Sequence, residues 1–184
     1  VVNTPPEAAV AHLEPTDPIS SDGLEMVIDV GSFDLDGDNI TYSYTWDRDG
    51  FAVDNPVYPT PRATLTESNT LRGEEWIVTA TPNDGYDDGP SVNDSVTIGN
   101  TPPLFTGLTL EPLSPSTTSD VTAIPTGWFD HDGDVADYQV VWTVSGVPVT
   151  GATGLVLPSS AFGQGDSIRA AVTAWDGFDT GNTL

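Results

Sequence analysis

Two short acidic loops hold the side chains of this 184-residue chain that are best suited to chemistry. In the first loop Asp34, Asp36 and Asp38 stand at alternate positions, and Gly37 permits the positive φ angle that folds them around one centre. Carboxylates converge in this way around a cation, and Ca²⁺ suits the loop because it takes about six to eight oxygen ligands in irregular geometry. The loop differs from an EF-hand, because its Gly stands fourth and no Glu occupies the twelfth position. The alternative interpretation is a solvated turn, since Asp and Gly favour turns for local reasons.

A second acidic loop begins at Asp84, and both loops occur twice in the chain. Asp130 repeats Asp34 at an offset of 96 (130 − 34), and Asp176 repeats Asp84 at an offset of 92 (176 − 84). We therefore expect Ca²⁺ as the cofactor, with no catalytic residues and no site for an organic cofactor. The predicted metal ligands are Asp34, Asp36, Asp38 and Asp84 in the first copy and Asp130, Asp132, Asp134, Asp176 and Asn100 in the second.

The repeat extends over nearly the whole chain. Asn3-Thr4-Pro5-Pro6 returns as Asn100-Thr101-Pro102-Pro103, at an offset of 97 (100 − 3), and Trp46 returns as Trp142 at an offset of 96 (142 − 46). Such a period exceeds the roughly 20 to 50 residues of a solenoid unit and matches a domain that buries its own core. The sequence predicts one domain over residues 1–99 and a second over residues 100–184.

Alternating apolar and polar residues indicate β-strands in both copies. Tyr42, Tyr44 and Trp46 place aromatic rings on one face of a strand, and Tyr138 and Trp142 repeat this pattern. The 18 Gly and 16 Pro residues interrupt the chain too often for long helices. The predicted fold is all-β, with two tandem immunoglobulin-like antiparallel β-sandwiches of about seven strands each. In such a sandwich the loops after the second and sixth strands lie at one end, beside the point where the chain enters the domain, so Asn3-Thr4 is expected to add an oxygen there.

The second copy is expected to lack its last strand, because no counterpart of the alternating run at 91–99 follows Asp176. We interpret the chain as a window from a longer array of repeats. The less favoured interpretation is that another subunit donates the missing strand to the exposed sheet edge.

Charge narrows the possible partners. The chain has 28 acidic and 4 basic residues and a formal net charge of −24, which disfavours binding to nucleic acid and to anionic lipid surfaces. No apolar run is long enough for a membrane span, so direct membrane insertion is not expected in this window. Cysteine is absent, which excludes disulfides and thiol metal sites. General adaptation to high salt is an open alternative explanation of the acidity.

The chain resembles the bacterial immunoglobulin-like repeats related to polycystic-kidney-disease and cadherin-like domains. The resemblance rests on the Asp-x-Asp-Gly-Asp loop, the Tyr-x-Tyr-x-Trp strand, the Gly73 to Gly85 stretch and the Asn-Thr-Pro-Pro linker. It implies large secreted or cell-surface proteins, often adhesins or stalks, and cadherin-like relatives bind Ca²⁺ at domain junctions. It therefore implies an extracellular or cell-surface location.

The function expected from these features is that of a structural or adhesive module in an extracellular stalk, fibre or filament, stiffened by Ca²⁺ near the domain junctions. The expected partners are neighbouring repeats, other copies of the chain in a filament, or a cell-surface glycan or protein. The alternative is an accessory carbohydrate-binding module of a secreted enzyme, which requires coplanar exposed rings on a sheet face. No enzymatic activity is expected, because the chain has no Gly-x-Ser-x-Gly motif and only two scattered histidines. Trp128 and Trp175 are expected either to pack against the first repeat or to fill the core of the second.

Overall fold

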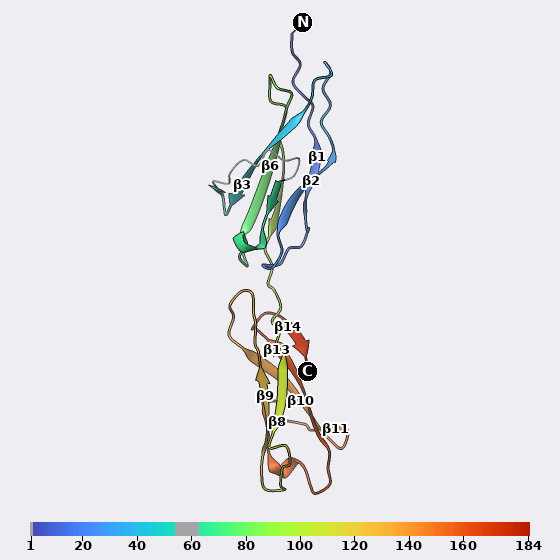
Figure 1. Cartoon of the computed structure of the whole chain (residues 1–184), viewed down its shortest axis with the longest axis vertical. Coiled ribbons are helices and arrows are strands. Elements are labelled where there is room, and N and C mark those ends of the chain that lie inside the picture. The colour runs from blue at the N-terminus through green and yellow to red at the C-terminus, as the bar shows by residue number, and fades with distance from the viewer. Residues whose placement is uncertain (1, 54–62) are drawn as a thin grey trace. The chain divides into compact units, whose positions relative to one another are not determined.

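The computed structural model describes residues 2–53 and 63–184 of the chain. The chain divides into two compact units, Val1–Asn100 (unit 1) and Thr101–Leu184 (unit 2). Figure 1 shows that each unit consists of β-strands joined by loops and short turns. Among the described residues, no helix is long and apolar enough to cross a membrane.

Unit 1 is a sandwich of two antiparallel sheets. Its strands are β1 (Val10–Glu14), β2 (Leu24–Val30), β3 (Thr41–Arg48), β4 (Phe51–Val53), β5 (Ala63–Leu65), β6 (Glu75–Asn83) and β7 (Val92–Thr97), with a 3-10 turn at Glu67–Asn69. One sheet has the order β1-β2-β5, and the other has the order β4-β3-β6-β7. This arrangement of three strands against four, with the second and third strands in different sheets, is that of an immunoglobulin-like sandwich.

The core of unit 1 follows from the two-residue period of its strands. Trp46 on β3 and Trp76 on β6 are 3% and 1% exposed, and their rings meet edge to face with centroids 6.1 Å apart. Leu13 and Met26 from the opposite sheet belong to the same buried cluster. Polar neighbours along each strand face outward, so burial of one face per strand holds the two sheets together.

Unit 2 repeats this architecture. Its strands are β8 (Gly107–Glu111), β9 (Val121–Thr126), β10 (Asp137–Val144), β11 (Val147–Pro148), β12 (Val156–Leu157), β13 (Ile168–Trp175) and β14 (Thr180–Thr183), with a 3-10 turn at Ser159–Ala161. The sheets have the orders β12-β9-β8 and β11-β10-β13-β14. Trp142 is fully buried, and its indole N–H donates to the Gly154 carbonyl at 2.8 Å. The predicted fold class of two tandem immunoglobulin-like sandwiches is confirmed.

The last strand of unit 2 differs from the expectation in one respect. We expected none, but β14 pairs with β13. Thr183 bonds Thr173 through its hydroxyl at 2.7 Å, as Ser91 bonds Thr81 at 2.8 Å in unit 1. The strand β14 therefore matches the residues just before β7, and it forms because Thr180 and Thr183 can pair with the end of β13 although they lack the apolar alternation that was sought.

Adjacent valines on β10 test the assignment of the two faces. Val140 is 6% exposed and lies in the core, whereas Val141 is 56% exposed on the outer face. We expect Val140→Ala to lower the free energy of unfolding of unit 2 by about 2 kcal/mol, because it leaves a cavity. The same change at Val141 is expected to cost less than about 1 kcal/mol. Denaturant unfolding of both variants measures the difference, and equal costs would contradict the assignment.

Candidate metal centre

The first acidic loop joins β2 to β3 and encloses Asp34, which is 5% exposed. Asp34 Oδ1 accepts hydrogen bonds from the backbone N–H groups of Asp36 at 2.8 Å and Asp38 at 3.1 Å. Gly37 takes a φ of 83°, which lets the loop close around this oxygen. Asp34 Oδ2 is buried and has no hydrogen-bond partner among the residues that the structure describes. The loop thus holds a desolvated carboxylate oxygen that no described donor satisfies.

The segment that leads into unit 1 contacts both acidic loops. The Thr4 backbone N–H donates to Asp36 Oδ2 at 2.7 Å. The Asn3 side-chain amide donates to Asp84 Oδ2 and to Asp87 Oδ2, each at 2.9 Å. The two loops and residues 3–4 therefore lie together at one end of unit 1. A cavity of about 460 Å³ at this end is lined by Val2, Asn3, Asp36, Asp38 and Tyr86.

Asp84 closes the second acidic loop. It is 5% exposed, and its Oδ1 accepts from the backbone N–H groups of Tyr86 at 2.7 Å and Asp87 at 2.8 Å. The backbone N–H of Asp87, followed by the Asn3 amide, holds the pKa of Asp84 below its usual value. Asp84 is therefore an anion that fixes the loop and the leading segment at once.

In unit 2 the acidic loop forms a tight cluster of carboxylates. One oxygen from each of Asp130, Asp132 and Asp134 lies within 4.8 Å of the others, and this is the only such group of three among the described residues. Asp130 Oδ1 accepts from the Asp134 N–H at 2.9 Å, while Asp130 Oδ2 is buried without a hydrogen-bond partner in the described part of the chain. Gly133 takes a φ of 78° at the position equivalent to Gly37.

The remaining predicted ligands of unit 2 have other partners. Asp176 is 7% exposed, and its Oδ1 accepts from the N–H groups of Phe178 and Asp179, both at 2.6 Å, as Asp84 does in unit 1. Asn100 belongs to unit 1 by its contacts, and its amide oxygen accepts a hydrogen bond from Arg72. The oxygen expected from Asn100 as a ligand is thus engaged by a guanidinium group.

Two contacts were not foreseen from the sequence. The Thr101 backbone N–H donates to Asp132 Oδ2 at 2.9 Å, matching the bond between Thr4 and Asp36. Asn3 acts as a donor to carboxylates, whereas an oxygen was expected from it. The repeated Asn-Thr-Pro-Pro sequence was the available signal, because prolines after Thr leave few other backbone donors in this segment.

The chemistry of this donor set favours a hard cation. Every side-chain group in the clusters is a carboxylate or an amide, and oxygen donors of this kind suit Ca²⁺ or Mg²⁺ rather than metals that prefer sulfur or imidazole. The unpartnered oxygens of Asp34 and Asp130 occupy equivalent positions in the two units. Asp130, Asp132 and Asp134 could hold such an ion in unit 2, and Asp34, Asp36 and Asp38 supply the corresponding groups in unit 1.

Trp128 and Trp175 lie within or beside the core of unit 2. The Trp128 ring meets Tyr138 edge to face with centroids 5.6 Å apart, and Tyr138 meets Phe105 in the same way at 5.4 Å. Trp175 is half-buried on β13 and pairs with Asp137 and Thr180. The contacts of Trp128 favour the interpretation in which this ring fills the core of its own unit.

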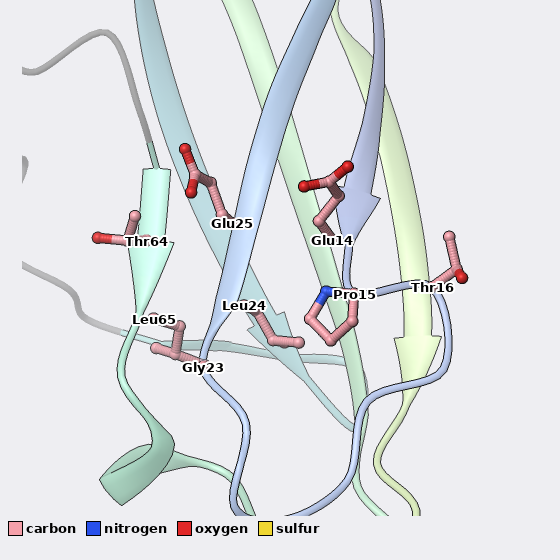
Figure 2. A pocket seen from close by; sticks show the side chains of 8 residues that line it. All are labelled: Glu14, Pro15, Thr16, Gly23, Leu24, Glu25, Thr64 and Leu65. Carbon is pink, nitrogen blue, oxygen red and sulfur yellow. The ribbon is translucent and has the colours of Figure 1, made fainter.

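A separate cavity of about 680 Å³ lies on the outer side of unit 1, away from the acidic loops (Figure 2). Glu14 on β1 stands directly opposite Glu25 on β2, and Leu24 and Leu65 supply apolar walls. Figure 2 shows these residues on three neighbouring strands at the end of the sheet. The described residues form no converging group of three acidic ligands here, so this cavity is not a second candidate metal centre.

His12 lies beside this cavity, between two carboxylates. Its Nδ1 is 2.8 Å from Asp29 Oδ2 on β2, and its Nε2 is 3.3 Å from Glu14 Oε1 on the same strand. The hydrogen bond to Asp29, followed by that to Glu14, raises the pKa of His12 above its usual value of 6.5. Protonated His12 therefore joins the first two strands of the sheet.

The comparisons with known proteins concern the fold alone. No protein-family model and no curated protein sequence matches the chain. Among solved structures, the FN1–FN3 domains of chicken CNTN1 are 14% identical over 99% of this chain and 64% of that chain, with a TM-score of 0.42. A segment of two fibronectin type-III domains from chicken tenascin is 15% identical over 98% of this chain and 97% of that chain, with a TM-score of 0.45. The N-terminal eight Ig domains of Down Syndrome Cell Adhesion Molecule are 15% identical over 96% of this chain and 24% of that chain, also at 0.45. The immunoglobulin-like assignment accordingly rests on the strand order of each unit.

The surroundings of His12 generate a pH prediction. Because its folded-state pKa lies above the unfolded value of about 6.5, protonated His12 stabilises unit 1 fully below pH 6.5, and this contribution is lost as the pH rises through the folded-state pKa. NMR titration should give His12 a pKa above 6.5. Asp29→Asn should lower that pKa more than Glu14→Gln does, because Asp29 makes the stronger hydrogen bond. An unshifted pKa, or a larger effect at Glu14, would contradict the geometry.

Proposed function

We propose that this chain is a structural or adhesive module of an extracellular repeat array, and that Ca²⁺ bound at the acidic loops stiffens it. The observation that supports this proposal most directly is the buried, unpartnered carboxylate oxygen at the first Asp of the loop in both units, Asp34 and Asp130. Burial of an ionised group without a partner is costly, and a bound cation removes that cost.

Calcium fits the loops better than magnesium does. The carboxylates come from a loop with irregular geometry, and Ca²⁺ accepts about six to eight oxygens in flexible arrangements, whereas Mg²⁺ demands near-octahedral geometry and keeps more water. Asp130, Asp132 and Asp134 supply the side-chain ligands in unit 2, and backbone carbonyls and water complete the shell. The acidic groups bond to their own loop backbone, which suits an ion cage better than proton transfer, so the proposed module is not catalytic.

The stiffening follows from the bond between each loop and the segment before it. Asp132 accepts the N–H of Thr101, and Asp36 accepts the N–H of Thr4. An ion that fixes these carboxylates also fixes the first residues of the unit. The prolines at 102–103 restrict the backbone further. Calcium therefore reduces the freedom of the linker between successive repeats.

Exposed rings beside the acidic loops support neighbouring repeats as partners. Phe33 and Tyr86 are 59% and 76% exposed in unit 1, and the matching Phe129 and Phe178 are 57% and 58% exposed in unit 2. Apolar groups that recur at one end of each unit are suited to cover by another domain. The fold and the negative charge fit the extracellular repeat arrays that the sequence resembles.

The carbohydrate-binding alternative has less support. A sugar platform needs coplanar exposed rings on a sheet face, but Trp46 and Trp142 are buried in the two cores. Tyr42 and Tyr44 are half-buried on the same inner face of β3 as Trp46. The exposed rings in the described residues include Phe33 and Tyr86, which belong to loops rather than to a sheet face.

Calcium should raise the melting temperature of both units. At a free concentration about 100 times its dissociation constant, a bound ion adds about 2.7 kcal/mol to the free energy of unfolding, which corresponds to several degrees for a domain of this size. Asp130→Asn should have opposite effects in the two states of unit 2. It should stabilise the ion-free protein, because it removes one charge from the cluster, and it should abolish most of the gain from calcium.

Calorimetric melting with calcium and with a chelator measures these changes. Asp17→Asn, an exposed change in the turn between β1 and β2, is the control and should leave the calcium response intact. Equal melting temperatures with and without calcium would refute the ion site. An ion-free Asp130→Asn protein that is less stable than the parent would refute the charge argument.

Calcium should also narrow the range of shapes that the two-unit chain adopts. Small-angle X-ray scattering is expected to report a well-defined extended particle with calcium and a broad distribution of bend angles with chelator. Asp132→Asn should reduce the difference, because it weakens the ion site beside Thr101. If scattering profiles of the parent protein coincide in both conditions, the ion does not stiffen the linker.

A further inference from the structure

Unit 2 has an apolar cavity of about 520 Å³ along one edge of its sandwich. We call this cavity and the adjoining edge of β13 the seam. The side chains that line the cavity come from β8, from the loop after it and from the first residues of β9 and β13. They include Leu108, Leu110, Pro112, Leu113, Val121 and Ile168.

The equivalent place in unit 1 is filled. Leu110 corresponds to Leu13 (110 − 13 = 97) and Ile168 to Trp76 (168 − 76 = 92). Leu13 and Trp76 are 0% and 1% exposed, whereas Leu110 and Ile168 are only half-buried. The difference arises because Ile98 and the strand β7 before it pack into the same core as Leu13 and Trp76.

Unit 1 also shows which side chains and bonds close the seam. Val96 and Ile98 are 9% and 1% exposed and stand two residues apart, so both face the core. Asp94 accepts the backbone N–H of Leu13 at 2.8 Å, and the Ile98 N–H donates to the Glu74 carbonyl at 2.9 Å. An extended chain with alternating apolar residues therefore satisfies both the core and the sheet edge.

The sheet edge in unit 2 is only partly paired. Leu184 exchanges two backbone hydrogen bonds with Val172, both at 2.9 Å. In an antiparallel sheet the backbone groups that point to one side alternate along a strand, so those of Ala170 and Ile168 point to the same edge. The described pairing between β14 and β13 does not reach these two residues, although their counterparts in unit 1 pair with Asp94 and Val96.

We propose that the seam of unit 2 binds an extended polypeptide strand, antiparallel to β13 and in line with β14, with an apolar side chain at every second position. An exposed sheet edge beside an apolar cavity binds in this way, because backbone bonds supply affinity and the cavity selects side chains. A compact ligand could fill the cavity but would leave the backbone groups of Ala170 and Ile168 unpaired. The proposal is independent of calcium binding.

A peptide with the sequence of residues 93–99, Asn-Asp-Ser-Val-Thr-Ile-Gly, tests the proposal. Thr183 matches Ser91, so this peptide would begin one residue beyond Leu184. Titrated into the 184-residue protein, it should shift the NMR signals of residues 108–110 and 168–170. Signals of unit 1 should not move, because β7 already fills the equivalent place. The same peptide with Val96→Asp and Ile98→Asp should cause no shift.

Fusion of the peptide sequence after Leu184 gives a second measurement. Linkage raises the effective concentration to about the millimolar range, so the fusion should raise the melting temperature of unit 2, and the doubly substituted fusion should not. Equal responses to the two sequences, or no response from either the free or the fused peptide, would overturn the proposal. Self-association of the protein through the seam that the peptide does not displace would overturn it as well, since the occupant would then be a second copy.

Discussion

The buried charge at the start of each acidic loop is the constraint on which the proposed function depends. Asp34 and Asp130 each give one oxygen to backbone N–H groups and leave the other desolvated and unpaired. A carboxylate in that position is tolerable only when a positive charge lies beside it. The arrangement recurs although the residue between the first two carboxylates differs, Leu35 in one unit and His131 in the other. The recurrence indicates that the loop is arranged for an ion rather than as a simple turn.

The sandwich brings the ion site to the linker through ordinary sheet geometry. The loop between β2 and β3 and the loop after β6 lie at one end of unit 1, and the leading segment joins both through Asn3 and Thr4. Burial of Trp46 and Trp76 between the sheets fixes the strands that carry these loops. The same geometry makes an incomplete edge visible in unit 2, where Leu110 is less buried than its counterpart. Ion binding and strand pairing are therefore two separate ways in which this chain can engage other segments.

The fold and the acidic loops could be predicted because they depend on local patterns. The two-residue alternation through Trp46 and Trp142 identifies strands with one buried face, and Asp-Gly spacing identifies tight loops. The role of Asn3 could not be predicted, because its amide orientation depends on two carboxylates more than 80 residues away. The pairing of His12 with Asp29 depends in the same way on the register between β1 and β2. The short strand β14 was missed because backbone pairing alone, without an apolar pattern, is enough to form it.

The most direct test of the ion site is anomalous diffraction from crystals grown with calcium. The account predicts one anomalous peak in the acidic loop of each unit, at about 2.3–2.6 Å from the oxygens now unpaired, Asp34 Oδ2 and Asp130 Oδ2. Absence of both peaks at saturating calcium, with those oxygens bonded instead to a protein donor or to water, would contradict it.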